Sequence, residues 1–156
     1  MARHVARIAW QSDGSFASGR YSRRHEWGFD GGARVVASSS PDVVPMPMSD
    51  PAGVDPEEAL VASVASCHML WFLSLAHDAG LIVDSYVDEA EGAMGRIAPG
   101  RLALTRIALR PAIAFSGRRP SEAELDALHH EAHERCFIAN SLKTEVVVEV
   151  PVSTPA

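Results

Sequence analysis

Residues 55–80, DPEEALVASVASCHMLWFLSLAHDAG, form the stretch of sequence that decides the fold. Asp55 can cap the N-terminus of a helix with its side chain, and Pro56 suits the first helical position because it has no N–H to satisfy. Gly80 is a natural helix stop because glycine readily adopts the left-handed conformation at a C-terminus. The pattern predicts a central helix over 56–79, about 36 Å long at a rise of about 1.5 Å per residue.

This predicted helix is apolar on nearly all sides. Residues 59–76 contain no charged side chain, and a helix that is hydrophobic all round is buried all round. The stretch also reaches the lower length limit for crossing a membrane, but Ser63, Ser66, His68 and Ser74 favour a buried helix of a soluble protein. A small domain has difficulty covering so long an apolar helix, so we expect a partner subunit to cover part of it.

The segments on either side of the helix predict a single α+β domain over residues 1–156. Short apolar runs predict strands, with Asp30-Gly31-Gly32 as a hairpin turn, and four prolines forbid regular structure over 41–55. Ser121 and Glu124 have capping-box spacing and predict the start of a second helix. The predicted elements are strands within 3–40 (5–10, 16–21, 26–29 and 34–38), a loop over 41–55, the helix over 56–79, strands within 82–115 (82–94 and 101–115), a helix over 122–135 and a strand over 145–150.

The composition excludes several classes of function. The 156 residues carry a net charge of −6 at pH 7 and include a single lysine, Lys143, so the basic surface of a nucleic-acid-binding protein is missing. Two cysteines are too few for a secreted disulfide scaffold, and residues 1–10 lack the apolar core of a signal peptide. We therefore expect a cytoplasmic protein with reduced thiols that binds neither nucleic acid nor membranes.

The two cysteines are candidate catalytic residues. Cys67 lies near the middle of the central helix and Cys136 at the end of the second one, and each alone is typical of a small core residue. If the helices pack together, the sulfurs could form a reversible disulfide, provided that the Cα atoms come within about 7 Å. Peroxide chemistry requires a thiolate, and Cys67 is too far into its helix for the dipole to favour that form. A cation at about 4 Å would contribute about 4 kcal/mol, and Arg23 and Arg24 are the candidates.

Histidines on the second predicted helix offer a competing interpretation. His129 and His133 are four residues apart and Cys136 follows three residues later, so the three side chains could share one face and bind zinc or another ligand. The chain contains no Cys-x-x-Cys and no His-Glu-x-x-His motif. A solvated helix face that carries histidines explains the same pattern more simply.

The cysteine segments resemble those of the osmotically induced OsmC and organic hydroperoxide resistance (Ohr) proteins. Their helix motif has Asn-Pro-Glu, a gap of nine small and apolar residues and then the reactive cysteine, which Glu57 and Cys67 match in spacing. The segment around Cys136, AHERCFIANS at 132–141, resembles the one that carries their second cysteine. Two differences are Asp55 in place of the usual asparagine and His68 where phenylalanine is frequent.

The resemblance implies a fold and a reaction. The fold would have antiparallel sheets wrapped around long central helices in an intertwined homodimer. The activity would be a thiol-dependent reduction of organic hydroperoxides, with an external dithiol as electron donor and with no metal, flavin or haem. Cys67 would be the peroxidatic thiol and Cys136 the resolving one, with Arg23, or alternatively Arg24, activating the thiol and Glu57 holding that arginine. A non-catalytic dimer of the same fold is the remaining alternative.

The position of Glu57 predicts where the site lies. Glu57 and Cys67 are ten residues apart, which is about 15 Å along an unbroken helix. Both side chains cannot share one hydrogen-bonded cluster within one straight helix, so we expect Glu57 to come from the partner and the site to lie across the dimer interface. Candidates for an apolar substrate wall, each of which could instead belong to the core, are Met46, Met48, Trp71, Phe72 and Phe137.

Overall fold

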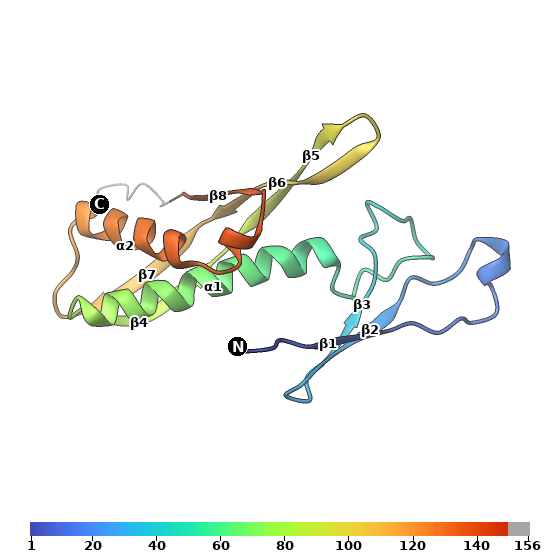
Figure 1. Ribbon diagram of the computed structural model, residues 1–156, viewed down its shortest axis with the longest axis horizontal. Coiled ribbons are helices and arrows are strands. Elements are labelled where there is room, and N and C mark those ends of the chain that lie inside the picture. The colour runs from blue at the N-terminus through green and yellow to red at the C-terminus, as the bar shows by residue number, and fades with distance from the viewer. Residues whose placement is uncertain (150–156) are drawn as a thin grey trace. The chain divides into compact units, whose positions relative to one another are not determined.

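The structure is a computed structural model that describes residues 1–149 and contains two compact units, Met1–Ala59 and a second that begins at Leu60. It is an α+β fold, as predicted, with strands before and after the long helix (Figure 1). The elements are β1 (Ala6–Ala9), η1 (Phe16–Ser18), β2 (His25–Phe29), β3 (Arg34–Ala37), α1 (Pro56–Asp78), β4 (Ile82–Asp88), β5 (Glu91–Ala98), β6 (Arg101–Leu109), β7 (Pro111–Ser116), α2 (Glu122–Arg135), η2 (Ala139–Ser141) and β8 (Glu145–Val148).

The N-terminal unit is built on an antiparallel sheet in the order β1-β2-β3. The predicted hairpin turn joins β2 to β3: Gly32 has a φ of +87°, and its N–H donates to the carbonyl of Phe29 at 3.0 Å. The register places Ile8, Trp27 and Val35 directly opposite one another, so they share one face of the sheet. The loop over 41–55 contains neither helix nor strand, apart from one bridge to β3, as predicted.

The predicted strand over 16–21 is wrong. The chain instead forms the short helix η1, and Phe16 packs against Tyr21 with ring centroids 4.8 Å apart. Trp10 completes this cluster at 5.7 Å from Phe16 and 5.6 Å from Tyr21. Aromatic residues favour strands in sequence patterns, but in this segment they pack against one another instead.

The long helix α1 begins and ends close to where the sequence predicts. The Glu58 N–H donates to Oδ1 of Asp55 at 2.8 Å, which satisfies one of the free donors of the first turn. Gly80, with a φ of +72°, follows the last helical residue, Asp78, two positions later. Local features of the sequence therefore mark both the start and the end of the helix.

Only one stripe of α1 is buried within this chain. The buried residues recur at every fourth position: Val64, His68, Phe72 and Ala76. Of the most apolar 18-residue window of the helix, 22% is buried. By length and composition alone the helix could cross a membrane, but core helices of soluble proteins meet the same criterion. The other apolar side chains of α1 are only partly buried or exposed by the described part of this chain, with Leu70 60% exposed.

The two strands predicted over 82–94 and 101–115 are four strands. β4 pairs with β7 and β5 pairs with β6, both antiparallel, and β8 adds to β6 in parallel. At the break between β6 and β7, the Arg110 N–H donates to Oδ1 of Asp88 at 2.7 Å. Its guanidinium donates to Glu91 at 2.8 Å and to Glu149 at 2.9 Å. β8 ends at Val148, and the last predicted strand position, 150, lies outside the described residues.

α2 covers the predicted range and packs on α1. Its N-cap, Ser121, forms the predicted capping box with Glu124, in which each side chain accepts from the other residue's backbone N–H. Ala132 joins Phe72 and Ala76 of α1 in a buried cluster, and α2 runs beside α1 in Figure 1. On the other side, β5 comes close to α1 at Gly92, where a Cβ would lie 2.6 Å from the Val61 side chain.

Candidate active site

The two cysteines meet where the end of α2 passes α1. Cys67 is half-buried, Cys136 is buried, and both are free thiols. Burial raises the pKa of the Cys136 thiol, and the neighbouring Cys67 thiol raises it further, although a hydrogen bond from the Ala139 N–H opposes this shift. Cys136 is therefore protonated at neutral pH. The two thiols therefore lie near each other in the reduced chain, and their pairing as a disulfide stays a prediction.

The backbone around Cys136 is held on both sides. Cys136 is the C-cap of α2, and its N–H donates to the carbonyl of His133 at 3.1 Å. Its own carbonyl accepts from the Asn140 N–H at 3.0 Å, and its Sγ accepts from the Ala139 N–H at 3.4 Å. The backbone position of Cys136 therefore follows the C-terminal end of α2.

An apolar pocket of about 310 Å³ opens beside Cys67. Leu70, Trp71, Ser74 and Phe137 form its other walls. The rings of Trp71 and Phe137 meet edge to face at 5.6 Å. Two of the five candidate wall residues therefore lie at the thiol, whereas Phe72 is fully buried in the core, and Met46 and Met48 belong to the N-terminal unit.

The histidines form a different arrangement from the proposed zinc cluster. Nδ1 of His129 lies 3.0 Å from Nε2 of His68, and both rings are buried. Within residues 1–149, no group of three His, Cys, Asp or Glu side chains could hold a metal ion. The alternative based on His129, His133 and Cys136 is therefore not favoured. The His68–His129 contact joins residues 61 positions apart, and no local sequence pattern could have revealed it.

The two candidate arginines have different partners. Arg24 donates to Oδ2 of Asp50 at 2.5 Å. The guanidinium of Arg23 lies over the ring of Tyr21, with Cζ 3.6 Å from the centroid, and donates to the Tyr21 carbonyl at 2.5 Å. Within residues 1–149, Arg23 has no carboxylate partner. Of the two candidate arginines, Arg23 is therefore the one whose charge is still available for an anion outside the described part of the chain.

Glu57 lies on the first turn of α1 and is half-buried. Glu57 and Arg23 belong to the N-terminal unit, whereas Cys67 and Cys136 belong to the second unit. Within the second unit, the structure brings together the two thiols and the apolar pocket. The approach of Arg23 and Glu57 to a thiol stays a prediction.

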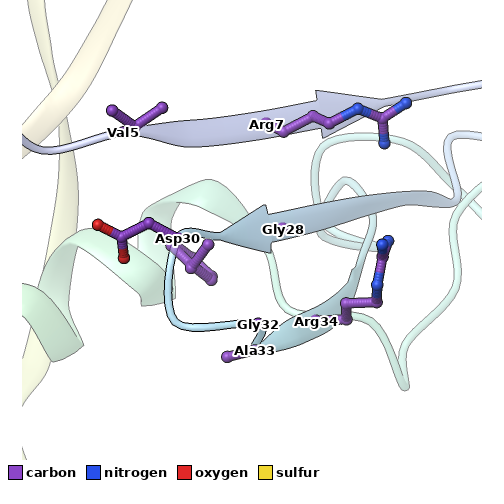
Figure 2. A pocket seen from close by; sticks show the side chains of 8 residues that line it. Val5, Arg7, Gly28, Asp30, Gly32, Ala33 and Arg34 are labelled. Carbon is purple, nitrogen blue, oxygen red and sulfur yellow. The ribbon is translucent and has the colours of Figure 1, made fainter.

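A second depression lies on the N-terminal sheet (Figure 2). Its volume is about 230 Å³, and Arg7, Gly28 and Arg34 lie side by side in register within it. Gly28 leaves space between the two flanking side chains, and both arginines point away from the turn that carries Asp30 (Figure 2). Arg34 is paired with Glu26. The residues that line the depression include no cysteine or histidine, so it offers no thiol or imidazole nucleophile.

Comparison with known proteins identifies the family. The family model for OsmC-like proteins matches residues 49–151, which is more than half of the 156-residue chain. The chain belongs to the OsmC-like family. None of the curated proteins matches it.

Solved structures agree with this assignment. An OsmC-like protein of unknown function from Vibrio cholerae is 48% identical with a TM-score of 0.93, over 96% of this chain and 99% of that one. The organic hydroperoxide resistance protein OsmC from Legionella pneumophila is 16% identical with a TM-score of 0.69, over 96% of each chain. An organic hydroperoxide resistance protein from Elizabethkingia anophelis is 16% identical with a TM-score of 0.70, over 96% and 94%. The last two likenesses establish the fold alone.

Proposed function

We propose that this chain is a cysteine-based peroxidase that reduces organic hydroperoxides to alcohols. The observation that carries the proposal is the contact between a half-buried thiol at an apolar pocket and a buried, protonated thiol. The first can meet an apolar hydroperoxide, and the second is placed to receive the oxidised sulfur. Two relatives of the same fold are named organic hydroperoxide resistance proteins, which is consistent with this reaction.

The proposed cycle uses only thiols and an external dithiol. The Cys67 thiolate attacks the distal peroxide oxygen, the O–O bond breaks, and the alkoxide takes a proton to leave as an alcohol. The Cys136 thiol then attacks the Cys67 sulfenic acid, so that an S–S bond forms, the S–O bond breaks and water leaves. An external dithiol reduces the disulfide by thiol exchange and is itself oxidised to a disulfide. The cycle needs no metal, flavin or haem, and it suits the cytoplasm, where dithiol reductants are available.

In this proposal, the partner subunit supplies the cation. Arg23 has an uncommitted charge, and Glu57 is about 15 Å along α1 from Cys67, too far to act on that thiol in the same chain. A homodimer also explains why only 22% of the apolar window of α1 is buried in a single chain. We assign Arg23 of one protomer to the stabilisation of the Cys67 thiolate of the other, with Glu57 holding that arginine.

Turnover of cumene hydroperoxide with dithiothreitol tests the reaction. The wild type should turn over repeatedly, and Cys67→Ser should show none. In the absence of dithiothreitol, Cys136→Ser should consume one equivalent and then stall, or proceed to sulfinic acid when peroxide is in excess. Equal rates for the wild type and Cys67→Ser would refute the proposed function.

Mixed dimers test the origin of the cation. Neither Cys67→Ser nor Arg23→Ala should be active alone. A heterodimer of the two has one site in which an intact Cys67 faces an intact Arg23 if the arginine acts across the interface, and it should recover activity. Arg24→Ala is the matched control and should stay active alone. An inactive heterodimer of Cys67→Ser and Arg23→Ala would show that the arginine acts within its own chain.

A further inference from the structure

We propose that the contact between His68 and His129 sets the register of α2 on α1 and so holds Cys136 against Cys67. The two histidines are positioning residues, because neither lines the pocket beside Cys67. The inference rests on the proposed function only for its peroxide measurement. Its main test is a thiol–disulfide equilibrium that requires no peroxidase activity.

The placement of the four residues links the two contacts. His68 directly follows Cys67 on α1, and His129 precedes Cys136 by seven residues, or about 10 Å along α2. Nε2 of His68 and Nδ1 of His129 are 3.0 Å apart, and the rings are stacked within 11° of parallel. Each helix thus carries one of the two bonded imidazoles and one of the two thiols, so fixing these imidazoles relative to each other also constrains the thiols.

The histidine contact is a directional contact between α1 and α2, which are also joined by the Arg135 guanidinium over the Trp71 ring, with Cζ 5.6 Å from the centroid. Among residues 1–149, and apart from the contact between the two thiols, it is the one side-chain hydrogen bond that joins α1 to α2. Around it, Phe72 and Ala76 pack on Ala132, and apolar contacts of this kind depend little on orientation. A hydrogen bond requires a defined distance and angle, and buried polar contacts are known to fix helix register. The His68–His129 bond can therefore select one register among several with similar apolar packing.

Each ring depends on the other for its hydrogen bond. His68 is 1% exposed and His129 is 4% exposed, and burial lowers the pKa of both to about 4. Both are therefore neutral at pH 7, and a neutral imidazole has one donor and one acceptor. The remaining nitrogens, Nδ1 of His68 and Nε2 of His129, have no partner within residues 1–149. A register shift would leave both rings without any partner in the interior, which is unfavourable.

A change in register would reach the sulfur directly. Cys136 is the C-cap of α2, and its N–H donates to the carbonyl of His133 in the last turn of that helix. A displacement of α2 therefore displaces Sγ by a similar amount. Reaction between two groups depends steeply on their separation, so the formation of the disulfide is the step most sensitive to this contact.

The test is the equilibrium between the protein thiols and glutathione. One oxidised glutathione is reduced to two glutathione molecules as Cys67 and Cys136 form their disulfide, and the equilibrium gives the effective concentration of the thiol pair. The double variant His68→Leu, His129→Leu replaces both polar partners with apolar groups, so its thermal unfolding midpoint should stay close to that of the wild type. Its effective thiol concentration should fall by about tenfold or more. A fall of less than about fivefold would overturn the proposal.

Two controls separate positioning from packing. His130→Leu changes an exposed histidine next to His129 and should leave the equilibrium unchanged, whereas an equally large fall would overturn the proposal. The pair His68→Gln, His129→Asn keeps a polar atom near each bonded nitrogen and should restore most of the effective concentration. If the double leucine variant fails to fold, His129→Asn and His129→Leu are compared singly. The asparagine variant should have the higher effective thiol concentration, and equal effective concentrations in the two variants would overturn the proposal.

The peroxide measurement distinguishes failure of this proposal from failure of the proposed function. With one equivalent of cumene hydroperoxide, the double leucine variant should form Cys67 sulfenic acid, trapped with dimedone, at the wild-type rate. It should then form the disulfide about tenfold more slowly. If the wild type does not react but the glutathione equilibrium responds as expected, only the proposed function fails. If the wild type reacts and the variant forms its disulfide at the wild-type rate, this inference fails.

Discussion

The two faces of α1 have similar composition but different surroundings. On the closed face, Val64, His68 and Phe72 are almost fully buried by the rest of their unit. On the open face, Cys67 is half-buried and Leu70 is 60% exposed. The closed face fixes the position of α2, whereas the open face holds the thiol and the apolar pocket. This chain thus completes its own packing on one side of α1 and leaves Cys67 on the other, partly exposed side.

The largest effect expected from a single substitution comes from placing a charge on the open face. Leu70→Glu puts a carboxylate where we expect the partner subunit to pack, and burying an unpaired charge is costly. Dimerisation should weaken by at least a hundredfold, or about 3 kcal/mol, measured by sedimentation at several concentrations. Leu70→Met conserves volume and should remain dimeric. If Leu70→Glu has the same mass in solution as the wild type, this face does not meet a partner.

The closed face should make stability depend on pH. Burial lowers the pKa of His68 and of His129 from 6.5 to about 4, so between these values the unfolded chain binds up to two more protons than the folded chain. The free energy of unfolding therefore falls as the pH falls through this window, by about 1.4 kcal/mol per pH unit for each proton. His133 disfavours the charged form of His68, and Asp126 favours the charged form of His129. Burial is the largest cause of the pKa shift of both histidines.

Urea unfolding between about pH 7 and pH 4.5 measures this dependence. The wild type is measured beside the His68→Leu, His129→Leu variant, because carboxylates affect both proteins equally. The free energy of unfolding should depend less steeply on pH in the variant than in the wild type. Identical slopes would show that the histidines are not buried as neutral groups.

A smaller effect is expected from removing apolar volume on the closed face. Val64→Ala should lower the free energy of unfolding by about 2 kcal/mol, because the cavity cannot be filled by relaxation of tightly packed neighbours. Chemical denaturation at one fixed protein concentration measures the change. The same substitution at the exposed Val43 should change stability by less than about 0.5 kcal/mol. Equal losses in the free energy of unfolding at the two positions would contradict the burial of Val64 on the closed face.

Local signals in the sequence predicted the helices well. Asp55 marks the start of α1 through its capping hydrogen bond, and Gly80 marks its end through its backbone conformation. Ser121 marks the start of α2 through its capping box. The split of 82–94 and 101–115 into four strands was not predicted, because apolar alternation continues across the break at Arg110. That break depends on Asp88, Glu91 and Glu149, which the chain brings together only on folding.

The candidate site was predictable in part. The spacing of Cys67 and Cys136 on two helices indicated a thiol pair, and the structure places the two thiols together. The place of the half-buried Trp71 beside the thiol could not be distinguished from the burial of Phe72, because α1 is apolar on all sides. The role of His68 depends on a partner 61 residues away. Long-range pairings of this kind follow from packing rather than from local pattern.

The parallel pairing of β8 with β6 has a consequence for the order of assembly during translation. Arg106 of β6 pairs with Glu145 of β8, so the sheet of β5, β6 and β8 is incomplete until Val148, the end of β8, has been synthesised. Val146 and Val148 then pack against the cluster that contains Val64 of α1. Nascent chains fold as segments emerge from the ribosome, and Cys67 emerges long before its sheet is closed. The Val64 side of the helix that carries Cys67 therefore stays uncovered by this strand from the time it leaves the ribosome until β8 docks on β6.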